Sequence, residues 1–198
     1  MAESIMTRLK LLTSFFIIGT LALGTGCAWQ KIPVAHDYSV SEKLPLKVGV
    51  RLSSKPGSTV VGPRVLEEWK DMGLFEEIVY PYREDDDVHL VLTLDIDGRW
   101  VGSGAGAGVV IGLTLGLASP FIGPSMEGTH TIDLVFNKEE KRIHNLRSTV
   151  STNVSWGLGA DVNEVSSKTD NLLIKKLANA GAALITEKRG EIISLGQS

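Results

Sequence analysis

Cys27 is the residue whose chemistry is most narrowly defined by its place in this chain. It is the only cysteine in the 198 residues, and it follows a basic start and an apolar stretch. A thiol can act as a nucleophile, bind a metal or carry an acyl group. No internal disulfide is open to it, and an exposed unpaired thiol is a liability in an oxidising exported compartment. Its setting therefore favours acylation.

The first 26 residues have the three parts of a secretory signal. Arg8 and Lys10 supply the positive charge, residues 11–23 form an uncharged apolar run, and residues 24–26 are small, as cleavage requires. The apolar run is shorter than the roughly 20 residues that a transmembrane helix needs. We therefore predict that residues 1–26 are a signal peptide that is removed.

The residues from Leu21 to Cys27 resemble a bacterial lipobox. In that motif the thiol receives diacylglycerol, the peptide is cut before the cysteine, and the new amine is acylated. Gly24 departs from the leucine that usually stands three positions before the cysteine. The resemblance implies S-diacylglycerol and N-acyl lipid on Cys27, and no other cofactor. Several acyl chains give lasting membrane attachment.

The residue after the cysteine bears on which membrane is reached. Ala28 stands where an aspartate would resemble an inner-membrane retention signal. The resemblance therefore implies that the protein is lipid-anchored at the periplasmic face of the outer membrane.

Histidines and paired aspartates are the other residues that could carry chemistry. Asp95 and Asp97 could form an acid–base pair. Their spacing is explained more simply if both lie on the solvent-exposed face of a strand. No serine-nucleophile or phosphate-loop motif is present. The four histidines lack the spacing of a zinc site and are scattered at His36, His89, His130 and His144. We predict no catalytic residue, no metal site and no enzymatic activity.

Charge and length limit the classes of partner and the number of domains. The formal net charge is −3, and no clustered basic face is present, so we expect no nucleic-acid partner. The chain that remains after signal removal suits one domain. Residues 27–44 lack periodicity and are predicted to be a lipidated tether. Residues 45–190 form the predicted periplasmic domain, and residues 191–198 are expected to be a flexible tail.

Alternating apolar and polar residues predict the strands of this domain. The clearest case is Leu90–Ile96, where leucine and isoleucine occupy every second position. The same pattern predicts further strands at residues 46–52, 74–80, 129–136 and 143–156. The last two can form an antiparallel hairpin around a polar turn.

Two helices are predicted beside these strands. The first runs from about Pro63 to Met72, with the proline in its first turn. The second runs from Asp170 to Lys188, with Thr169 as its N-cap and a stripe of leucines for packing. Residues 53–58 and 157–167 are expected to be loops. The predicted fold class is therefore α+β, a mostly antiparallel sheet of about 4–5 strands packed by two helices.

Residues 100–126 form an apolar, glycine-rich insertion without a single charged residue. Four of its glycines recur every four residues and would make one smooth helical face, as in closely packed membrane helices: Gly104, Gly108, Gly112 and Gly116. Glycine also recurs at every second position from 102 to 108, which would suit an extended hairpin. We expect this insertion, with Trp100 at a headgroup boundary, to contact lipid or a second copy. A glycine-rich loop or strand pair buried in the core is the alternative.

The order of these elements resembles a broad group of uncharacterised proteobacterial lipoproteins. In these, a small α+β periplasmic domain carries an apolar Gly-Leu-Thr-Leu-Gly-Leu…Pro insertion before two strands and a C-terminal helix. The resemblance covers roughly residues 45–189. More distantly, the order is similar to lipoproteins of curli-type export pores, whose rings place amphipathic hairpins in the outer membrane. The insertion here lacks the polar and apolar alternation of a porin-like strand.

These features together predict a non-enzymatic outer-membrane lipoprotein that acts as an envelope assembly or interaction module. The expected partners are membrane lipid and either an envelope protein or further copies of the same chain. The alternative is an oligomeric secretion or export component whose protomers join their insertions in a ring. An enzyme acting on envelope polymers would require a cleft that gathers Asp95, Asp97 and a histidine.

Overall fold

The computed structural model describes residues 30–102, 124–138, 141–157 and 160–197. The chain divides into two compact units, each of which is described by itself. The smaller unit contains described residues from segments 30–32, 102–126 and 154–166. The larger unit contains those from segments 33–101, 127–153 and 167–197, and it holds most of the hydrophobic core.

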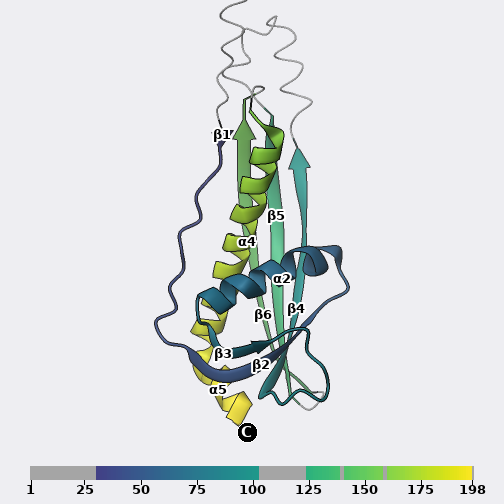
Figure 1. Cartoon of the computed structure of the whole chain (residues 1–198), viewed down its shortest axis with the longest axis vertical. Helices are drawn as coiled ribbons and strands as arrows, with labels where there is room; N and C mark the ends of the chain where they lie inside the picture. Colours follow the sequence, from purple (N-terminus) through teal and green to yellow (C-terminus); the bar gives the residue numbers. More distant parts are fainter. Residues whose placement is uncertain (1–29, 103–123, 139–140, 158–159, 198) are drawn as a thin grey trace, which may run out of the picture. The chain divides into compact units, whose positions relative to one another are not determined.

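The described chain contains both strands and helices, which confirms the predicted α+β class (Figure 1). Their order is β1 (Gln30–Lys31), β2 (Leu44–Leu52), α2 (Pro56–Asp71), β3 (Phe75–Val79), β4 (Leu90–Gly102), β5 (Ser125–Lys138), β6 (Lys141–Trp156), α4 (Val162–Glu187) and α5 (Arg189–Gln197). Within the described residues, the strands form one 6-stranded sheet in the order β1-β6-β5-β4-β2-β3.

The sheet mixes parallel and antiparallel pairing. β2 lies between β3 and β4 and pairs in parallel with both, whereas β1 pairs antiparallel with β6. Parallel neighbours need a crossover connection, and α2 supplies it between β2 and β3. The sequence predicts a mostly antiparallel sheet of about 4–5 strands. The described sheet has one strand more, because β1 adds an edge within the predicted tether, and its parallel part follows from the crossover.

Helix α2 begins at Pro56 instead of Pro63, and Pro63 lies inside it. Pro56 occupies the first turn, where a helix does not need the missing N–H. Gly57 lets this turn lie directly against β4, because a Cβ there would come within 2.5 Å of the carbonyl oxygen of Ile96. The prediction of a loop over residues 53–58 is therefore wrong from Pro56 onward.

Helix α4 also starts earlier than its leucine pattern suggests. The Asp161 carboxylate accepts hydrogen bonds from the backbone N–H groups of Asn163, at 2.9 Å, and Glu164, at 3.4 Å. These are the bonds of an N-cap residue, and the helix begins at Val162. Thr169 lies inside the helix and is buried. The prediction of Thr169 as N-cap is therefore wrong. The predicted loop at residues 157–167 is also wrong from Val162 onward, where the helix has already begun.

The predicted flexible tail is wrong, because residues 189–197 form helix α5. Ile192 is fully buried in the hydrophobic core. Gly196 lies against Leu46 of β2, where a Cβ would come within 2.5 Å of the leucine side chain. The last helix therefore covers the first strand of the core.

Residues 33–43, within the predicted tether, have no regular secondary structure but are held on α4 and α5. Lys175 of α4 pairs with the Asp37 carboxylate at 2.9 Å. The Asn179 side chain donates a hydrogen bond to the carbonyl oxygen of His36 at 2.6 Å. These contacts keep this stretch on the domain, so it is not a free linker.

The hydrophobic core lies between one face of the sheet and the helices. The predicted alternation of β4 is confirmed, with Leu90, Leu92, Leu94 and Ile96 all buried. Helix α2 adds a buried stripe with the i, i+3, i+4, i+7 spacing of an amphipathic helix, made of Gly62, Val65, Leu66 and Trp69. The Trp69 Nε1 donates to the carbonyl oxygen of Ala178 at 2.8 Å, which ties α2 to α4.

Gly181→Ala tests how closely α4 approaches α2. An alanine Cβ would lie 2.4 Å from the Trp69 ring, which is fully buried and is also held by its hydrogen bond to Ala178. Overpacking costs about 1–3 kcal/mol, more than the roughly 1 kcal/mol that alanine gains over glycine in a helix. We expect a lower free energy of unfolding in urea for the full-length protein in mild detergent.

Gly190→Ala is the matched control, because nothing lies within 4 Å of its Cβ position in α5. Its free energy of unfolding should stay unchanged or rise. Equal effects of the two substitutions would contradict tight packing at Gly181.

Candidate functional site

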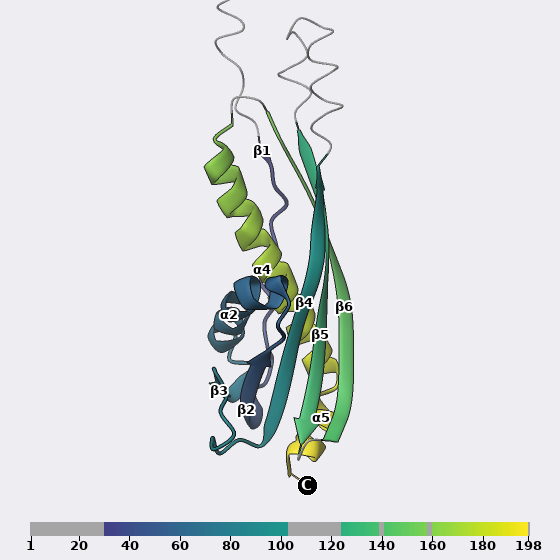
Figure 2. The same ribbon diagram turned by 90° about the vertical axis from the view of Figure 1, so that its right-hand side faces the viewer.

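A groove of about 520 Å³ opens on the larger unit, on the face of β4, β5 and β6 that is turned away from the helices. Figure 2 shows α2 and α4 on the opposite side of these strands, and no described element covers this side. Along β4 and β5, buried side chains of the core alternate with more exposed ones that face the groove. Its lining consists of Lys55, Asp97, Gly98, Arg99, Thr129, Thr131, Asp133, Arg147 and Thr149.

Side-chain length explains why a groove forms on this sheet. Its central strand β5 contributes Thr129 and Thr131, whose side chains are short. The side chains of Lys55, Arg99 and Arg147 are much longer and can rise above the strands. The groove is therefore polar throughout, with hydroxyl groups among charged groups of both signs.

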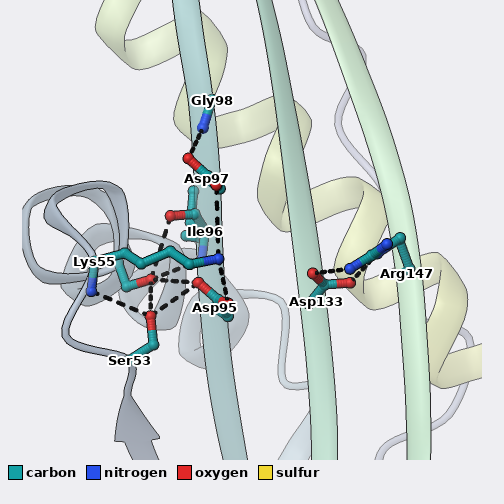
Figure 3. A network of polar contacts seen from close by, with 9 residues as sticks. Ser53, Lys55, Asp95, Ile96, Asp97, Gly98, Asp133 and Arg147 are labelled. Carbon is teal, nitrogen blue, oxygen red and sulfur yellow. Dashed lines mark hydrogen bonds and ion pairs between the residues drawn. The ribbon is translucent and has the colours of Figure 1, made fainter.

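Arg147 and Asp133 form a two-pronged ion pair between β6 and β5 (Figure 3). The Arg147 Nη2 lies 2.8 Å from one Asp133 oxygen, and the Nε lies 2.5 Å from the other. The hydrogen bonds and the charge of Asp133 raise the pKa of Arg147. Such a bidentate pair fixes the direction of the guanidinium, so Arg147 is positioned in the groove by its neighbour.

A second polar cluster joins the N-terminus of α2 to β4. The Lys55 Nζ lies 2.8 Å from an Asp95 oxygen and 3.6 Å from an Asp97 oxygen, and the Ser53 hydroxyl donates to Asp95 at 2.8 Å. Burial alone would raise the pKa of Asp95, but the hydrogen bonds from Lys55 and Ser53 outweigh it and lower this pKa. The hydrogen bond to Asp95 raises the pKa of Lys55.

Ser58 lies behind this cluster and is fully buried. Its hydroxyl accepts a hydrogen bond from the N–H of Ile96 at 2.7 Å and lies 2.8 Å from the Ser53 hydroxyl. Strand β2 pairs with β4 only as far as Leu52 and Leu94. Ser58 therefore supplies the hydrogen-bond partner that β2 no longer provides at Ile96. Sequence reasoning missed this residue because it expected a loop there.

The protonation states of this cluster do not suit acid–base catalysis. A serine nucleophile paired with lysine needs a lysine whose pKa is lowered, so that the amine can accept a proton near neutral pH. Here the pKa of Lys55 is raised and that of Asp95 is lowered. Both groups therefore keep their charges near neutral pH, and the cluster holds α2 against β4.

His130 is not part of the groove. It is buried among the inward-facing residues of β5, and its Nδ1 has no hydrogen-bond partner among the described residues. Burial lowers the pKa of His130, against an opposing effect from the charge of Asp97. Among the described residues, the groove lining includes Asp97 but neither Asp95 nor a histidine. Within the described segments, no group of three potential metal ligands is found.

The residues predicted for lipid attachment and membrane contact are described only at Trp100. Cys27 and the spaced glycines Gly104, Gly108, Gly112 and Gly116 lie outside the described residues. Trp100 is partly buried on β4, where its ring meets His130 edge-on at 5.3 Å. It also lies over Gly128, where a Cβ would come within 2.6 Å of the ring. Its contact with lipid stays a prediction.

None of the helices in the described part of the chain combines the length and the apolar character needed to cross a bilayer.

Comparison with known proteins finds similarity in solved structures alone, since no family model and no curated protein matches the sequence. A Xanthomonas campestris protein of the DUF330 family is 10% identical, with 81% of this chain and 97% of that chain covered and a TM-score of 0.45. The rare lipoprotein B of Shewanella oneidensis is 12% identical, with 77% and 99% covered and a TM-score of 0.40. A minor lipoprotein of Acinetobacter baumannii is 12% identical, with 76% and 95% covered and a TM-score of 0.42.

Asp95→Asn tests whether the cluster stabilises the fold through charge. Because folding lowers the pKa of Asp95, its contribution is present at pH values above the ordinary pKa of 3.8. That contribution is lost as the pH falls through the lower folded pKa. We expect the substitution to lower the free energy of unfolding by about 1–2 kcal/mol at neutral pH. Urea unfolding followed from neutral pH down to about pH 2 should show the difference from wild type shrinking.

Asp97→Asn serves as the control, since the Asp97 side chain is 71% exposed and its distance to Lys55 is 3.6 Å. It should have little effect at either pH. A loss for Asp95→Asn that is the same at neutral and acidic pH would show that shape, and not charge, is what the cluster requires.

Proposed function

We propose that this protein is a lipid-anchored lipoprotein of the outer membrane whose periplasmic domain binds another envelope component without catalysing a reaction. The anchoring half of the proposal rests on the segment from Leu21 to Cys27. The binding half rests on one observation, the polar groove on a sheet face that no described helix covers.

The charge state of the groove supports binding over catalysis. Two of its cationic side chains already form ion pairs within the domain, Lys55 with Asp95 and Arg147 with Asp133. Groups held in fixed charge states are poor proton donors and acceptors, but they make stable, directional contacts to a partner. A protein that binds through this face needs no movement of its own core.

The composition of the face supports a macromolecular partner. Thr, Asp and Arg side chains of three neighbouring strands meet in the groove, and Val101 of β4 is 57% exposed in the same unit. Protein interfaces combine apolar residues at their centre with a polar, solvent-accessible rim, and this face offers both kinds of residue. Ring assembly through Gly104–Gly116 stays the alternative prediction.

Cys27→Ser tests the anchor. Without the thiol, diacylglycerol cannot be attached, and the cut that follows this attachment in a lipobox should not occur. We expect loss of labelling by radioactive palmitate and accumulation of a precursor that retains residues 1–26. Gel mobility, with the intact mass of the purified protein, measures both effects.

Ser39→Ala is a suitable control, since it changes a serine outside residues 1–27 and should leave labelling intact. A Cys27→Ser protein that is still processed to the wild-type mass would contradict lipid attachment at Cys27.

Ala28→Asp tests the membrane that the anchor reaches. An aspartate directly after the acylated cysteine would resemble an inner-membrane retention signal, whereas Ala28 does not. We expect wild-type protein to sediment with the outer membrane on a sucrose gradient and Ala28→Asp to shift to the inner-membrane fraction. Ala28→Ser, with no added charge, should stay with wild type. Wild-type protein in the inner-membrane fraction would contradict the proposed location while leaving the lipid anchor itself intact.

A further inference from the structure

Within the larger unit, residues 98–101 of β4 form a strand edge that no described strand covers. β2 covers this side of β4 as far as Leu94, whose carbonyl oxygen accepts the N–H of Ser53 at 3.0 Å. The Ser58 hydroxyl then accepts a hydrogen bond from the N–H of Ile96. Beyond that point no strand among the described residues lies beside β4 on this side (Figure 1).

The backbone of this edge is oriented for strand pairing. The carbonyl of Leu94 and the N–H of Ile96 both face the β2 side. In a strand, the backbone groups of every second residue point to the same side, so those of Gly98 and Trp100 also face the uncovered edge. Trp100 keeps the same inward side-chain direction as Ile96, because its ring packs on Gly128 and His130.

Among the described residues, a side chain protects the start of this edge. The Asp97 carboxylate turns along the strand and accepts the N–H of Gly98 at 2.8 Å, as Figure 3 shows. Strand edges left open readily pair with another extended chain, and proteins commonly block them with charged side chains. Asp97 can be displaced from Gly98 by a carbonyl oxygen, since its side chain is 71% exposed.

Arg99 indicates the chemistry of the chain that would pair here. It is exposed, lines the groove, and makes no hydrogen bond or ion pair with any residue that the structure describes. On the same face of β4, Asp97 precedes it and the exposed Val101 follows it. A complementary strand would place a carboxylate beside Arg99, an uncharged residue beside Asp97 and an apolar residue beside Val101.

We propose that residues 98–101 of β4 bind an extended segment of a partner protein, which adds to the sheet and directs a carboxylate side chain to Arg99. This proposal rests on the interaction role proposed above and names its partner chemistry. Main-chain hydrogen bonds would supply the pairing, and the charge at Arg99 would supply the preference for an acidic segment.

The test uses full-length, isotope-labelled protein in mild detergent and the blocked hexapeptide Thr-Val-Glu-Val-Thr-Val. Binding should shift the backbone amide resonances of Gly98, Trp100 and their neighbours and slow hydrogen exchange at the Trp100 amide. Replacing Glu by Gln in the peptide should weaken binding about two- to fivefold, the range of an exposed ion pair. Arg99→Gln should remove that difference, whereas Arg64→Gln, on the exposed face of α2, should keep it.

Two N-methylated peptides distinguish strand pairing from general contact. One carries N-methyl groups on odd positions and the other on even positions, so that only one set faces β4. Strand addition predicts that one of these peptides loses binding and the other keeps it. Equal behaviour of the two, shifts confined to other elements, or no binding of the parent peptide would overturn the proposal.

Self-association is the remaining outcome to separate. If the Trp100 amide is already protected without peptide, and the protection rises with protein concentration, a second copy occupies the edge and the proposed partner is wrong. If the proposed lipid anchor is wrong, palmitate labelling will show it, and the peptide-binding result will be unchanged. The two proposals can therefore fail independently.

Discussion

The arrangement of this domain depends on how the backbone of β4 is hydrogen-bonded at the point where its pairing with β2 ends. The crossover helix α2 starts at Pro56, shortly after Leu52, the last residue of β2 that pairs with β4, and a helix start cannot continue the strand ladder. At this point the Ser58 hydroxyl accepts a hydrogen bond from the backbone N–H of Ile96, and Gly57 allows the start of α2 to lie directly against β4. Buried backbone groups need such partners. Because α2 is fixed at this point, Trp69 and α4 can pack behind the strands.

The same junction sets the character of the outer face. Lys55 and Ser53 come from the connection between β2 and α2, and both are held by Asp95 of β4. Lys55 and Ser53 therefore already have polar partners within the domain. Arg147 of β6 and Asp133 of β5 likewise form an ion pair with each other. Among the described residues of this face, those available to another molecule include Arg99, the threonines of the groove and the strand edge at residues 98–101. The domain combines a rigid polar face with a few groups that have no internal role.

Local patterns predict the elements of this fold better than their connections. Alternation alone identifies β4 from Leu90 to Ile96, because each inward position faces a continuous core. The start of α2 is missed because Pro56–Gly57 is typical of a turn, and only the closeness of Ile96 shows that glycine is needed within a helix. Thr169 and Asp161 are both residue types favoured at the N-cap, so the residue type of Thr169 does not exclude it. The groove could not be predicted, since Arg99 and Arg147 come together only through the order of the strands.

The packing of α5 on β2 has a consequence for how the domain is produced. Leu46 belongs to the first core strand, yet its covering residue Gly196 is in the last helix. The contact between Leu46 and Gly196 can form only after α5 has been made, so the core is completed late. On the proposed export route, the same contact would form only once the α5 segment has crossed the membrane, so compaction would be completed after passage. Contacts between such distant segments also slow folding, because a large loop must be ordered first.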